Sequence, residues 1–350
     1  MIRVLIVEDS PVVQQLMEHI LQTDPSIKIV GIANNGIDAV EMVKQKRPDA
    51  ITMDIHMPKL DGITATRIIM ETNPTPIIIV SSSFLDDEVT STFQAIEAGA
   101  LAVLHRPAGI GHPDYQKTAE ELITTVKLMS EVKVVRRSST NAQKNLIDYD
   151  KTKETSFNRA ELSSKKEYKI VAIGASTGGP LVLQTILSSI NKDFSLPILI
   201  VQHIAEGFLK GFVEWLSQSS NLPIHIAEHN QLIKPGNVYV APENFNMGLS
   251  SFNKILLDKS GTENGHKPSV SYLFRTVASV VKSNAIGILL TGMGKDGAQE
   301  LKLIKDKGGL TIVQNLESSV VHGMPGEAIK LDGVVYTLPP VEIANLLNKL

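Results

Sequence analysis

Short runs of apolar, often β-branched residues alternate with stretches in which apolar residues recur every three or four positions. The runs are typical of buried strands, and the periodic stretches are typical of helices that cross between parallel strands. Helices are expected over Pro11–Gln22 and Gly36–Lys46, for example. Five strands and five helices in about 130 residues predict a flavodoxin-like doubly wound sheet. The first five strands are expected over 3–7, 27–33, 50–53, 76–80 and 101–104.

The alternation resumes in the second half of the chain, with apolar runs at 169–173, 197–201 and 285–290. Gly, Pro and Asn residues are frequent between Leu222 and Lys267, which predicts shorter strands there that can pair antiparallel. We therefore expect an α/β fold throughout, with a flavodoxin-like first domain and a doubly wound, mainly parallel α/β second domain.

The pattern stops between about Val132 and Lys166. Nine Lys or Arg and four Asp or Glu residues lie between Lys133 and Lys166. A structureless stretch longer than about 15 residues is unusual inside a compact domain, so this segment is interpreted as a solvated tether. A length of 350 residues also favours two domains. The predicted division is a first domain over 1–125, a linker over 126–166 and a second domain over 167–350.

Composition excludes several classes of site and partner. The net charge is −3 and the pI is near 6.3, so no electrostatic argument supports binding to nucleic acid or membrane. The absence of cysteine excludes disulfides, thiolate zinc sites and a cysteine nucleophile. No apolar run reaches the length of about 18 residues that a membrane span needs, and the N-terminus does not resemble a signal peptide. We expect a cytoplasmic protein without direct membrane insertion.

Acidic residues follow two of the predicted strands in the first domain. Glu8 and Asp9 come after the first strand, and Asp54 comes after the third. Ligands of doubly wound sheets bind beyond the carboxyl ends of the strands, so these carboxylates are expected to lie together. Clustered carboxylates repel one another unless a cation joins them, and hard oxygen ligands suit Mg²⁺. A carboxylate beside Mg²⁺ can attack a phosphoryl group.

Two further strand ends contribute to the same edge. Ser81 ends the fourth strand, where its hydroxyl can bond a phosphoryl oxygen, and Arg106 follows the fifth strand as a cation. Taken singly, acids after strands are better explained as helix caps, as Asp9-Ser10-Pro11 permits. The ordered set favours a site: VLIVEDSP, ITMDIHMPKLDG, IIIVSSS and HRP.

This ordered set resembles the response-regulator receiver family over about residues 1–125. The resemblance implies that Glu8, Asp9 and Asp54 bind Mg²⁺ and that a histidine kinase donates a phosphoryl group to Asp54. It also implies that Ser81 is the switch hydroxyl. The family usually has lysine where this chain has Arg106, and a planar guanidinium fork is not equivalent to a compact ammonium.

The segment KIVAIGASTGGP predicts a strand, a Gly-rich turn and a helix start around Ser176. Its centre, Gly174 to Gly178, matches the G-x-S-x-G nucleophile elbow. Small neighbours let the backbone turn sharply and present the serine oxygen at a helix N-terminus, where positive dipole favours an oxyanion. Gly-rich turns also bind phosphates, so the pentapeptide alone leaves both interpretations open.

A base and an orienting acid favour catalysis over phosphate binding. His203 is the histidine that directly follows an apolar strand in the second domain, whereas His225 lies on a short strand, and His266 and His322 lie in loops. Asp296, in GILLTGMGKDGA, also follows a buried strand, although an N-cap aspartate is the simpler interpretation of this residue alone. The order Ser, His, Asp along the chain differs from the three hydrolase orders usually described.

Five motifs together resemble the catalytic domain of the chemotaxis protein-glutamate methylesterase family: GASTGGP, QHIAEGF, HKPSVSYLF, TGMGKDGA and SSVVHGMPGEAI. The resemblance implies that Ser176 is the nucleophile, His203 the general base and then acid, and Asp296 the group that orients His203. It adds Thr177 and Met293 beside them, with the Met293 amide as an oxyanion donor. It further implies hydrolysis of γ-glutamyl methyl esters and deamidation of glutamines on methyl-accepting chemoreceptors, with no cofactor in this domain.

Two other functions stay open from the sequence. The second domain of a non-enzymatic response regulator could bind a phosphorylated ligand at the GASTGG turn, in which case His203 and Asp296 are dispensable. The same hydrolase could instead act on a methylated protein outside motility. A transcription factor is disfavoured, because the second domain has no basic recognition helix.

Overall fold

The structure is a computed structural model, and it describes residues 1–81, 86–134 and 166–350. The chain divides into two compact units, 1–149 and 150–350, and each is described by itself. Most of the predicted linker, and the two serines after Ser81 in the IIIVSSS motif, lie outside the described residues. No helix in the described ranges is long and apolar enough to cross a membrane.

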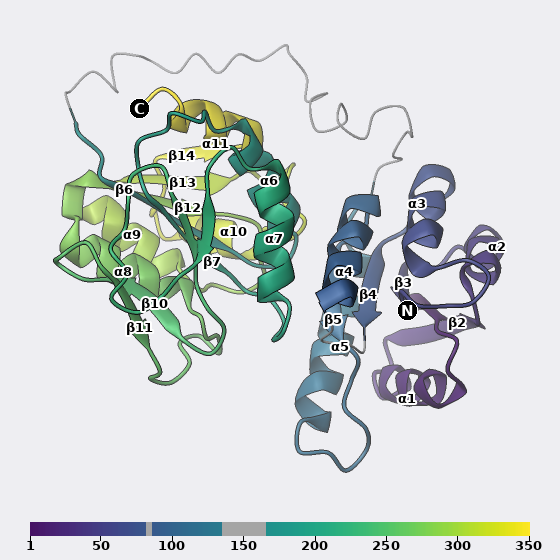
Figure 1. Cartoon of the computed structure of the whole chain (residues 1–350). Coiled ribbons are helices and arrows are strands. Elements are labelled where there is room, and N and C mark those ends of the chain that lie inside the picture. The colour runs from purple at the N-terminus through teal and green to yellow at the C-terminus, as the bar shows by residue number, and fades with distance from the viewer. Residues whose placement is uncertain (82–85, 135–165) are drawn as a thin grey trace. The chain divides into compact units, whose positions relative to one another are not determined.

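The first unit is a parallel five-stranded sheet in the order β2-β1-β3-β4-β5, with helices on both faces (Figure 1). This order is that of flavodoxin-like sheets, so the predicted fold class is confirmed. Its strands are β1 Ile2–Val7, β2 Ile27–Ala33, β3 Ala50–Met53, β4 Ile77–Ser81 and β5 Ala102–His105. Its helices are α1 Pro11–Gln22, α2 Gly36–Lys46, α3 Gly62–Thr72, α4 Asp86–Ala98 and α5 Tyr115–Ser130.

Apolar burial explains why these segments form a sheet covered on both sides. α1 and α5 contact one another, while α2, α3 and α4 form a second connected set. All four residues of β3 are buried, as expected for a central parallel strand. Each fully buried Ile or Leu contributes roughly 1.5–3 kcal/mol. The predicted domain end at 125 falls inside α5, which continues to Ser130 because Val126 and Met129 are buried.

The second unit is a seven-stranded sheet in the order β14-β13-β12-β6-β7-β9-β8, in which every neighbouring pair is parallel. Its strands are β6 Ile170–Ala175, β7 Ile198–Gln202, β8 Ile224–Ile226, β9 Val238–Val240, β12 Ala285–Leu289, β13 Leu310–Gln314 and β14 Tyr336–Leu338. Among the strands, the antiparallel pairing expected between Leu222 and Lys267 occurs in a separate hairpin of β10 Asn246–Leu249 and β11 Ile255–Asp258, whereas β8 and β9 are parallel. Isolated antiparallel bridges join Leu232 to Lys254 and Glu263 to His266.

Helices cover this sheet in two groups. α6 Gly179–Ser189 contacts α7 Leu209–Ser219 and α11 Pro340–Leu347. α9 Ala298–Asp306 contacts α8 Val270–Val280 and α10 Gly323–Lys330, and Figure 1 shows α8 and α9 on the opposite side of the sheet from α6 and α7.

The strand order of the second unit reverses between β6 and β12. From β6 the chain proceeds through β7 to one edge of the sheet, and β12 then begins the other half. The carboxyl ends of strands beside such a switch point are where doubly wound folds bind ligands. Ser176 follows β6, His203 follows β7, and Asp296 lies in the loop after β12.

Candidate active site and acidic cluster

Ser176 lies in the turn that joins β6 to α6. Backbone conformation and close packing explain why glycines stand on both sides of it. Gly178, the N-cap residue of α6, has a φ of 78°, a left-handed conformation that favours glycine. At Gly174 a Cβ would lie 2.2 Å from a methyl carbon of Val270, so the helix start on the next layer leaves no room for a side chain. Ser176 itself is 9% exposed.

Hydrogen bonds tie this turn to the neighbouring strand ends. The Ser176 N–H donates to the Thr291 carbonyl (3.0 Å), and the His203 N–H donates to the Ala175 carbonyl (2.9 Å). The side-chain amide of Gln202 donates to both the Ser176 carbonyl (2.9 Å) and the His203 carbonyl (2.7 Å). Because Ala175 and Gln202 are paired in register, Ser176 and His203 leave adjacent strands at the same level.

His203 and Asp296 are brought together although they are far apart in sequence. His203 Nε2 lies 3.0 Å from Asp296 Oδ2. An ionised carboxylate only accepts hydrogen bonds, so Nε2 carries the proton and Nδ1 has the free lone pair when the ring is neutral. Nδ1 is buried and has no hydrogen-bond partner in the described part of the chain, so it is not yet bonded to Ser176. The aspartate here contacts Nε2, whereas in the serine-protease triad the aspartate contacts Nδ1.

Asp296 is the most heavily bonded side chain of the site and is 1% exposed. Burial acts to raise the pKa of Asp296, but hydrogen bonds from His203, Val270 and Ser271 outweigh it and hold the pKa well below its usual range. The positive end of the α8 helix dipole also stabilises this carboxylate. Its carboxylate accepts five hydrogen bonds: from His203 Nε2, Asn264 Nδ2, Ser269 Oγ and the amides of Val270 and Ser271.

The N-cap interpretation of Asp296 is wrong, because Gly297 is the N-cap residue of α9 and Ser269 is the N-cap residue of α8. The Asp296 carboxylate nevertheless accepts the first-turn amides of α8. The same carboxylate also bonds His203, so one residue joins the start of α8 to the histidine.

The loop between β12 and α9 packs its backbone against the nucleophile turn. A Cβ on Gly292 would lie 2.7 Å from the Ser176 Cβ, so this close approach requires glycine. The Thr291 hydroxyl donates to the Thr177 carbonyl (2.9 Å). Met293 follows in the same loop with 43% of its side chain exposed. Thr177 follows Ser176 in its turn, and Met293 follows Gly292 in this loop; the supporting roles of Thr177 and Met293 stay predictions.

The other histidines of this unit are bonded in different surroundings. His225 pairs with Asn237 Oδ1 at 2.9 Å, and His322 Nδ1 lies 3.2 Å from the Ser319 hydroxyl. His266 belongs to the site, because its ring stacks on the His203 ring with centroids 3.9 Å apart and planes inclined by 10°.

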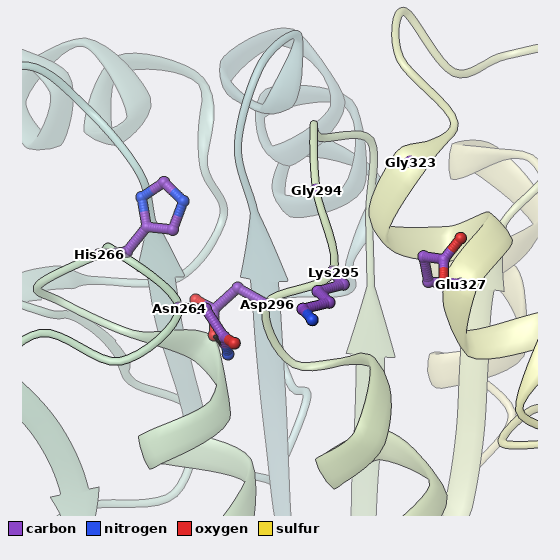
Figure 2. A pocket seen from close by; sticks show the side chains of 7 residues that line it. All are labelled: Asn264, His266, Gly294, Lys295, Asp296, Gly323 and Glu327. Atoms are coloured by element: carbon purple, nitrogen blue, oxygen red, sulfur yellow. Dashed lines mark hydrogen bonds between the residues drawn. The ribbon is translucent and has the colours of Figure 1, made fainter.

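A cavity of about 710 Å³ opens beside the His203–Asp296 pair. Figure 2 shows Asn264 and Asp296 side by side, with His266 on the same loop as Asn264. Ser176 and His203 do not line this cavity, so it extends outward from Asp296 rather than from Ser176. Its lining residues are Asn264, His266, Gly294, Lys295, Asp296, Gly323 and Glu327.

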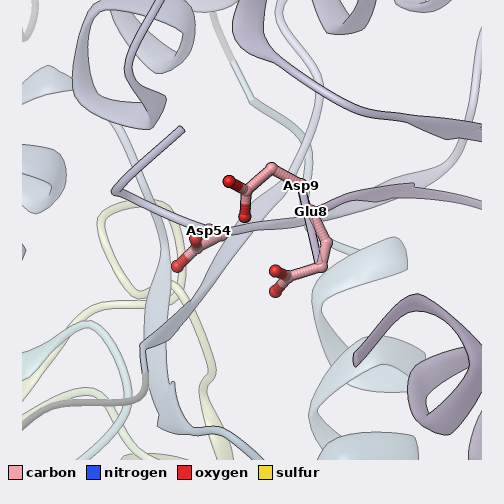
Figure 3. A group of neighbouring side chains, drawn as sticks. All are labelled: Glu8, Asp9 and Asp54. Carbon is pink, nitrogen blue, oxygen red and sulfur yellow. The ribbon is translucent and has the colours of Figure 1, made fainter. Parts of the chain in front are cut away.

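The acidic cluster of the first unit forms at the carboxyl ends of β1 and β3. One ligand oxygen from each of Glu8, Asp9 and Asp54 lies within 4.8 Å of the others, and Figure 3 shows the three carboxylates around a common space. Glu8 and Asp54 are buried. Burial, with the nearby Asp54 charge, raises the pKa of Glu8 to about 7, and burial also raises the pKa of Asp54. Three hard oxygen donors whose negative charge is poorly solvated fit a divalent cation such as Mg²⁺.

Arg106 supplies a cation to this cluster. Its guanidinium lies 3.2 Å from Glu8 Oε2 and 3.9 Å from Asp54 Oδ1. Arg106 Nε is buried without a hydrogen-bond partner among the described residues, so one donor of the fork is unused. Ser81 is 1% exposed, at the end of β4.

The helix-cap interpretation of Asp9 is wrong, because Ser10 is the N-cap residue of α1.

These two arrangements define a class of protein: a receiver-type phosphorylation domain joined to a hydrolase-type α/β domain with a serine beside a histidine–aspartate pair. Comparison with protein families agrees. Residues 4–112 match the response regulator receiver domain, and residues 171–347 match the CheB methylesterase family. The chain belongs to the CheB methylesterase family and carries that family's receiver domain.

Relatives resemble the chain over its whole length. It is 53% identical over 350 residues to a protein-glutamate methylesterase/protein-glutamine glutaminase of Nitrosospira multiformis, covering 100% of this chain and 97% of that protein. A protein of the same name from Syntrophus aciditrophicus is 52% identical, covering 100% and 98%. The crystal structure of the Thermotoga maritima CheB methylesterase catalytic domain matches with a TM-score of 0.51 at 39% identity, covering 52% of this chain and 98% of that domain.

Sequence reasoning missed several residues that hold the site together. Gln202, Ser269 and Ser271 were given no role, and Asn264 was not singled out. Asn264-Gly265 is the dipeptide typical of a tight two-residue hairpin turn, and this signal identifies the turn without saying which strand ends it approaches.

Proposed function

We propose that this chain is a protein-glutamate methylesterase that is activated by phosphorylation of Asp54 and uses Ser176, His203 and Asp296 as its catalytic residues. The observation that carries the proposal is the 3.0 Å contact between His203 and Asp296 next to the buried Ser176. The substrates proposed are γ-glutamyl methyl esters on methyl-accepting chemoreceptors, with glutamine deamidation as the related reaction. The full-length similarity to proteins named for both activities supports this choice.

In the proposed mechanism His203 Nδ1 removes the proton from the Ser176 hydroxyl as the oxygen attacks the ester carbonyl. Asp296, bonded to Nε2, stabilises the imidazolium that forms. The protonated ring then donates to the leaving methoxide oxygen, which departs as methanol. Water, deprotonated by the same ring, hydrolyses the acyl-enzyme. A positioned base of this kind typically contributes about 10²–10⁴-fold in rate.

The developing oxyanion needs donors near Ser176. The N-terminus of α6 begins three residues after the nucleophile and offers positive dipole. We propose the backbone amide of Met293 as a second contributor, because its loop packs directly against Ser176. Each such donor is typically worth about 10²–10³-fold in kcat.

In the receiver unit, Glu8, Asp9 and Asp54 are the residues proposed to hold Mg²⁺. When bound, the ion would neutralise charge on the phosphoryl group during its transfer to Asp54. Arg106 and the Ser81 hydroxyl are proposed to contact the phosphoryl oxygens afterwards. The proposed donor is a chemotaxis histidine kinase. The proposed compartment is the cytoplasm, where the resemblance places the methylated receptor domains.

Phosphorylation should control the rate of ester hydrolysis through Asp54. In wild-type protein a small phosphodonor such as acetyl phosphate should increase methanol release from methylated receptor membranes roughly 5- to 150-fold, the usual range of allosteric coupling. Asp54→Asn should keep the basal rate and lose the increase. Asp49→Asn, which removes a carboxylate bonded to the Arg3 amide outside the cluster, is the matched control. An Asp54→Asn protein that still responds to the phosphodonor would contradict the assignment.

Arg106 should contribute to phosphoryl transfer through both its charge and its fork. Losing a charge-assisted hydrogen bond costs about 1.5–3 kcal/mol, so Arg106→Ala should slow phosphate incorporation about 10- to 100-fold. Arg106→Lys keeps the positive charge, so it should lower the rate of phosphate incorporation less than Arg106→Ala does. Incorporation of radiolabelled phosphate from acetyl phosphate measures both rates. Equal rates in the lysine and alanine variants would mean that the positive charge at position 106 does not contribute to phosphoryl transfer.

A further inference from the structure

A tight turn reaches the catalytic pair from outside the strand ends already described. Glu263 and His266 form an antiparallel bridge, with N–H to carbonyl distances of 3.0 and 2.9 Å. The two residues between them have positive φ, 52° for Asn264 and 82° for Gly265. This is the geometry of the two-residue Asn-Gly hairpin turn, in which both central residues are left-handed. We call residues 263–266 the clamp turn.

The clamp turn contacts both His203 and Asp296, each through a different side chain. His266 stacks face to face on His203 at 3.9 Å. Asn264 Nδ2 donates to Asp296 Oδ1 at 3.2 Å. Both residues also line the cavity that Asp296 borders, so the clamp turn forms part of the cavity wall beside the pair (Figure 2).

The clamp turn is itself anchored to α8, the helix whose first-turn amides bind Asp296. The Arg275 guanidinium pairs with the Glu263 carboxylate at the base of the turn. Asn264 Nδ2 also donates to the Ser271 hydroxyl (3.0 Å), which in turn accepts the Gly297 amide (2.9 Å). Turn, helix start and catalytic acid are thus joined in one hydrogen-bonded unit, which indicates a defined position for the His266 ring.

We propose that the clamp turn is a positioning element for the general base, in which His266 and Asn264 fix the His203 ring so that Nδ1 faces Ser176. This inference rests on the proposed function of Ser176, His203 and Asp296. A stacked ring limits rotation and tilt of the His203 imidazole and keeps water from one of its faces. A displacement of about 1 Å at a catalytic group can cost about 10²-fold in rate, so such restraint has a large effect.

The charge state of His266 is consistent with this role. Burial, and then the neighbouring His203, lower the pKa of His266 to about 4, while Asp296 acts in the opposite direction. His266 is therefore neutral at pH 7, and a neutral ring can remain stacked when His203 gains a proton during turnover. The other charged groups lining the adjoining cavity are Lys295 and Glu327, and Lys267 follows His266 in the chain.

A pair of shape-matched substitutions in the full-length protein tests the proposal. His266→Phe keeps a flat ring that can stack, whereas His266→Leu fills similar space without a face. Asn264→Ala removes the bond to Asp296. His229→Ala is the control, because His229 is an exposed histidine of the same unit that accepts the Leu257 amide on the β10–β11 hairpin. Methanol release from methylated receptor membranes gives kcat, KM and the pH profile of kcat/KM, and thermal unfolding monitors the fold.

His266→Leu is expected to lower kcat about 10- to 100-fold with KM changed less than about twofold. It should also move the acid limb of the kcat/KM profile to higher pH, since water reaching the exposed imidazole face makes the imidazolium easier to form. His266→Phe should recover kcat to within about fivefold of wild type, and Asn264→Ala should lose about 10-fold. His229→Ala should match wild type.

The outcomes separate this inference from the proposed function. Suppose that Ser176→Ala abolishes turnover but His266→Leu keeps the wild-type rate and pH profile. The positioning role of the clamp turn is then wrong, and the catalytic assignment of Ser176 stands. If Ser176→Ala keeps turnover, the catalytic assignment itself fails. A merely structural role for His266 would lower the unfolding temperature equally in the phenylalanine and leucine variants without moving the pH profile. If the leucine variant does not fold, Asn264→Ala decides, and an unchanged kcat there overturns the proposal.

Discussion

Replacing Ser176 with alanine should lower methanol release on the order of 10⁴- to 10⁶-fold while phosphate incorporation at Asp54 stays at the wild-type level. The Ser176 hydroxyl is the proposed nucleophile, and the residual rate should reflect only oxyanion stabilisation and substrate binding. The side chain is small and its backbone amide, not its hydroxyl, bonds the Thr291 carbonyl, so the turn should survive the change. Turnover of methylated receptor membranes and radiolabelled phosphate incorporation, measured on the same preparation, check both halves of the expectation.

The matched control is Ser217→Ala. Ser217 lies on α7, and its hydroxyl donates to the Val213 carbonyl one turn earlier in the same helix. This variant should hydrolyse esters at the wild-type rate. Retained turnover in Ser176→Ala would move the chemistry to another residue, and loss of phosphate incorporation would mean that the substitution perturbs more than the active site.

Asp296→Asn should lower kcat about 10⁴-fold and also destabilise the second unit by roughly 3–5 kcal/mol. Catalysis suffers because an amide oxygen does not stabilise the His203 imidazolium as a carboxylate does. Stability suffers because the carboxylate accepts five hydrogen bonds in a buried site, and an amide nitrogen cannot accept from the Val270 amide. Trp215 is the single tryptophan of the chain and is 4% exposed on α7, so its fluorescence during denaturation reports on this unit.

The depressed pKa of Asp296 also gives that stabilisation a pH dependence. A carboxyl whose pKa is lower in the folded than in the unfolded state stabilises fully above its unfolded value of about 3.9, and the contribution is lost as pH falls. The free energy of unfolding of the wild type should therefore decrease more steeply below about pH 4 than that of Asp296→Asn. Parallel curves for the two proteins would show that Asp296 titrates alike in the folded and unfolded states.

The strands and the sheet class follow from the sequence because each central strand is buried on both faces and must be apolar throughout. The predicted runs at 27–33 and 50–53 coincide with β2 and β3, and those at 76–80 and 101–104 differ from β4 and β5 by one residue. The same reasoning anticipated that Ser176 and His203 would each follow an apolar strand. Strand ends of a parallel sheet meet at one edge, so motif and position reinforce each other.

Features that depend on contacts between distant segments could not be predicted in this way. No periodicity indicates that Asp296 accepts the first-turn amides of α8, a helix that precedes it in the chain, rather than those of α9. The Asn264-Gly265 dipeptide predicts a turn, but its approach to His203 is set by the packing of α8 against the sheet. The predicted domain end at 125 falls short of the end of α5, in which Val126 and Met129 are buried.

Because Asp296 accepts the amide hydrogens of Val270 and Ser271, we expect unfolding of the first turn of α8 to break the His203–Asp296 contact as well. Slow exchange of those two amides with deuterated solvent should accordingly mark molecules that are competent for ester hydrolysis. Fraying of this single helical turn would abolish ester hydrolysis while the seven-stranded sheet remained folded.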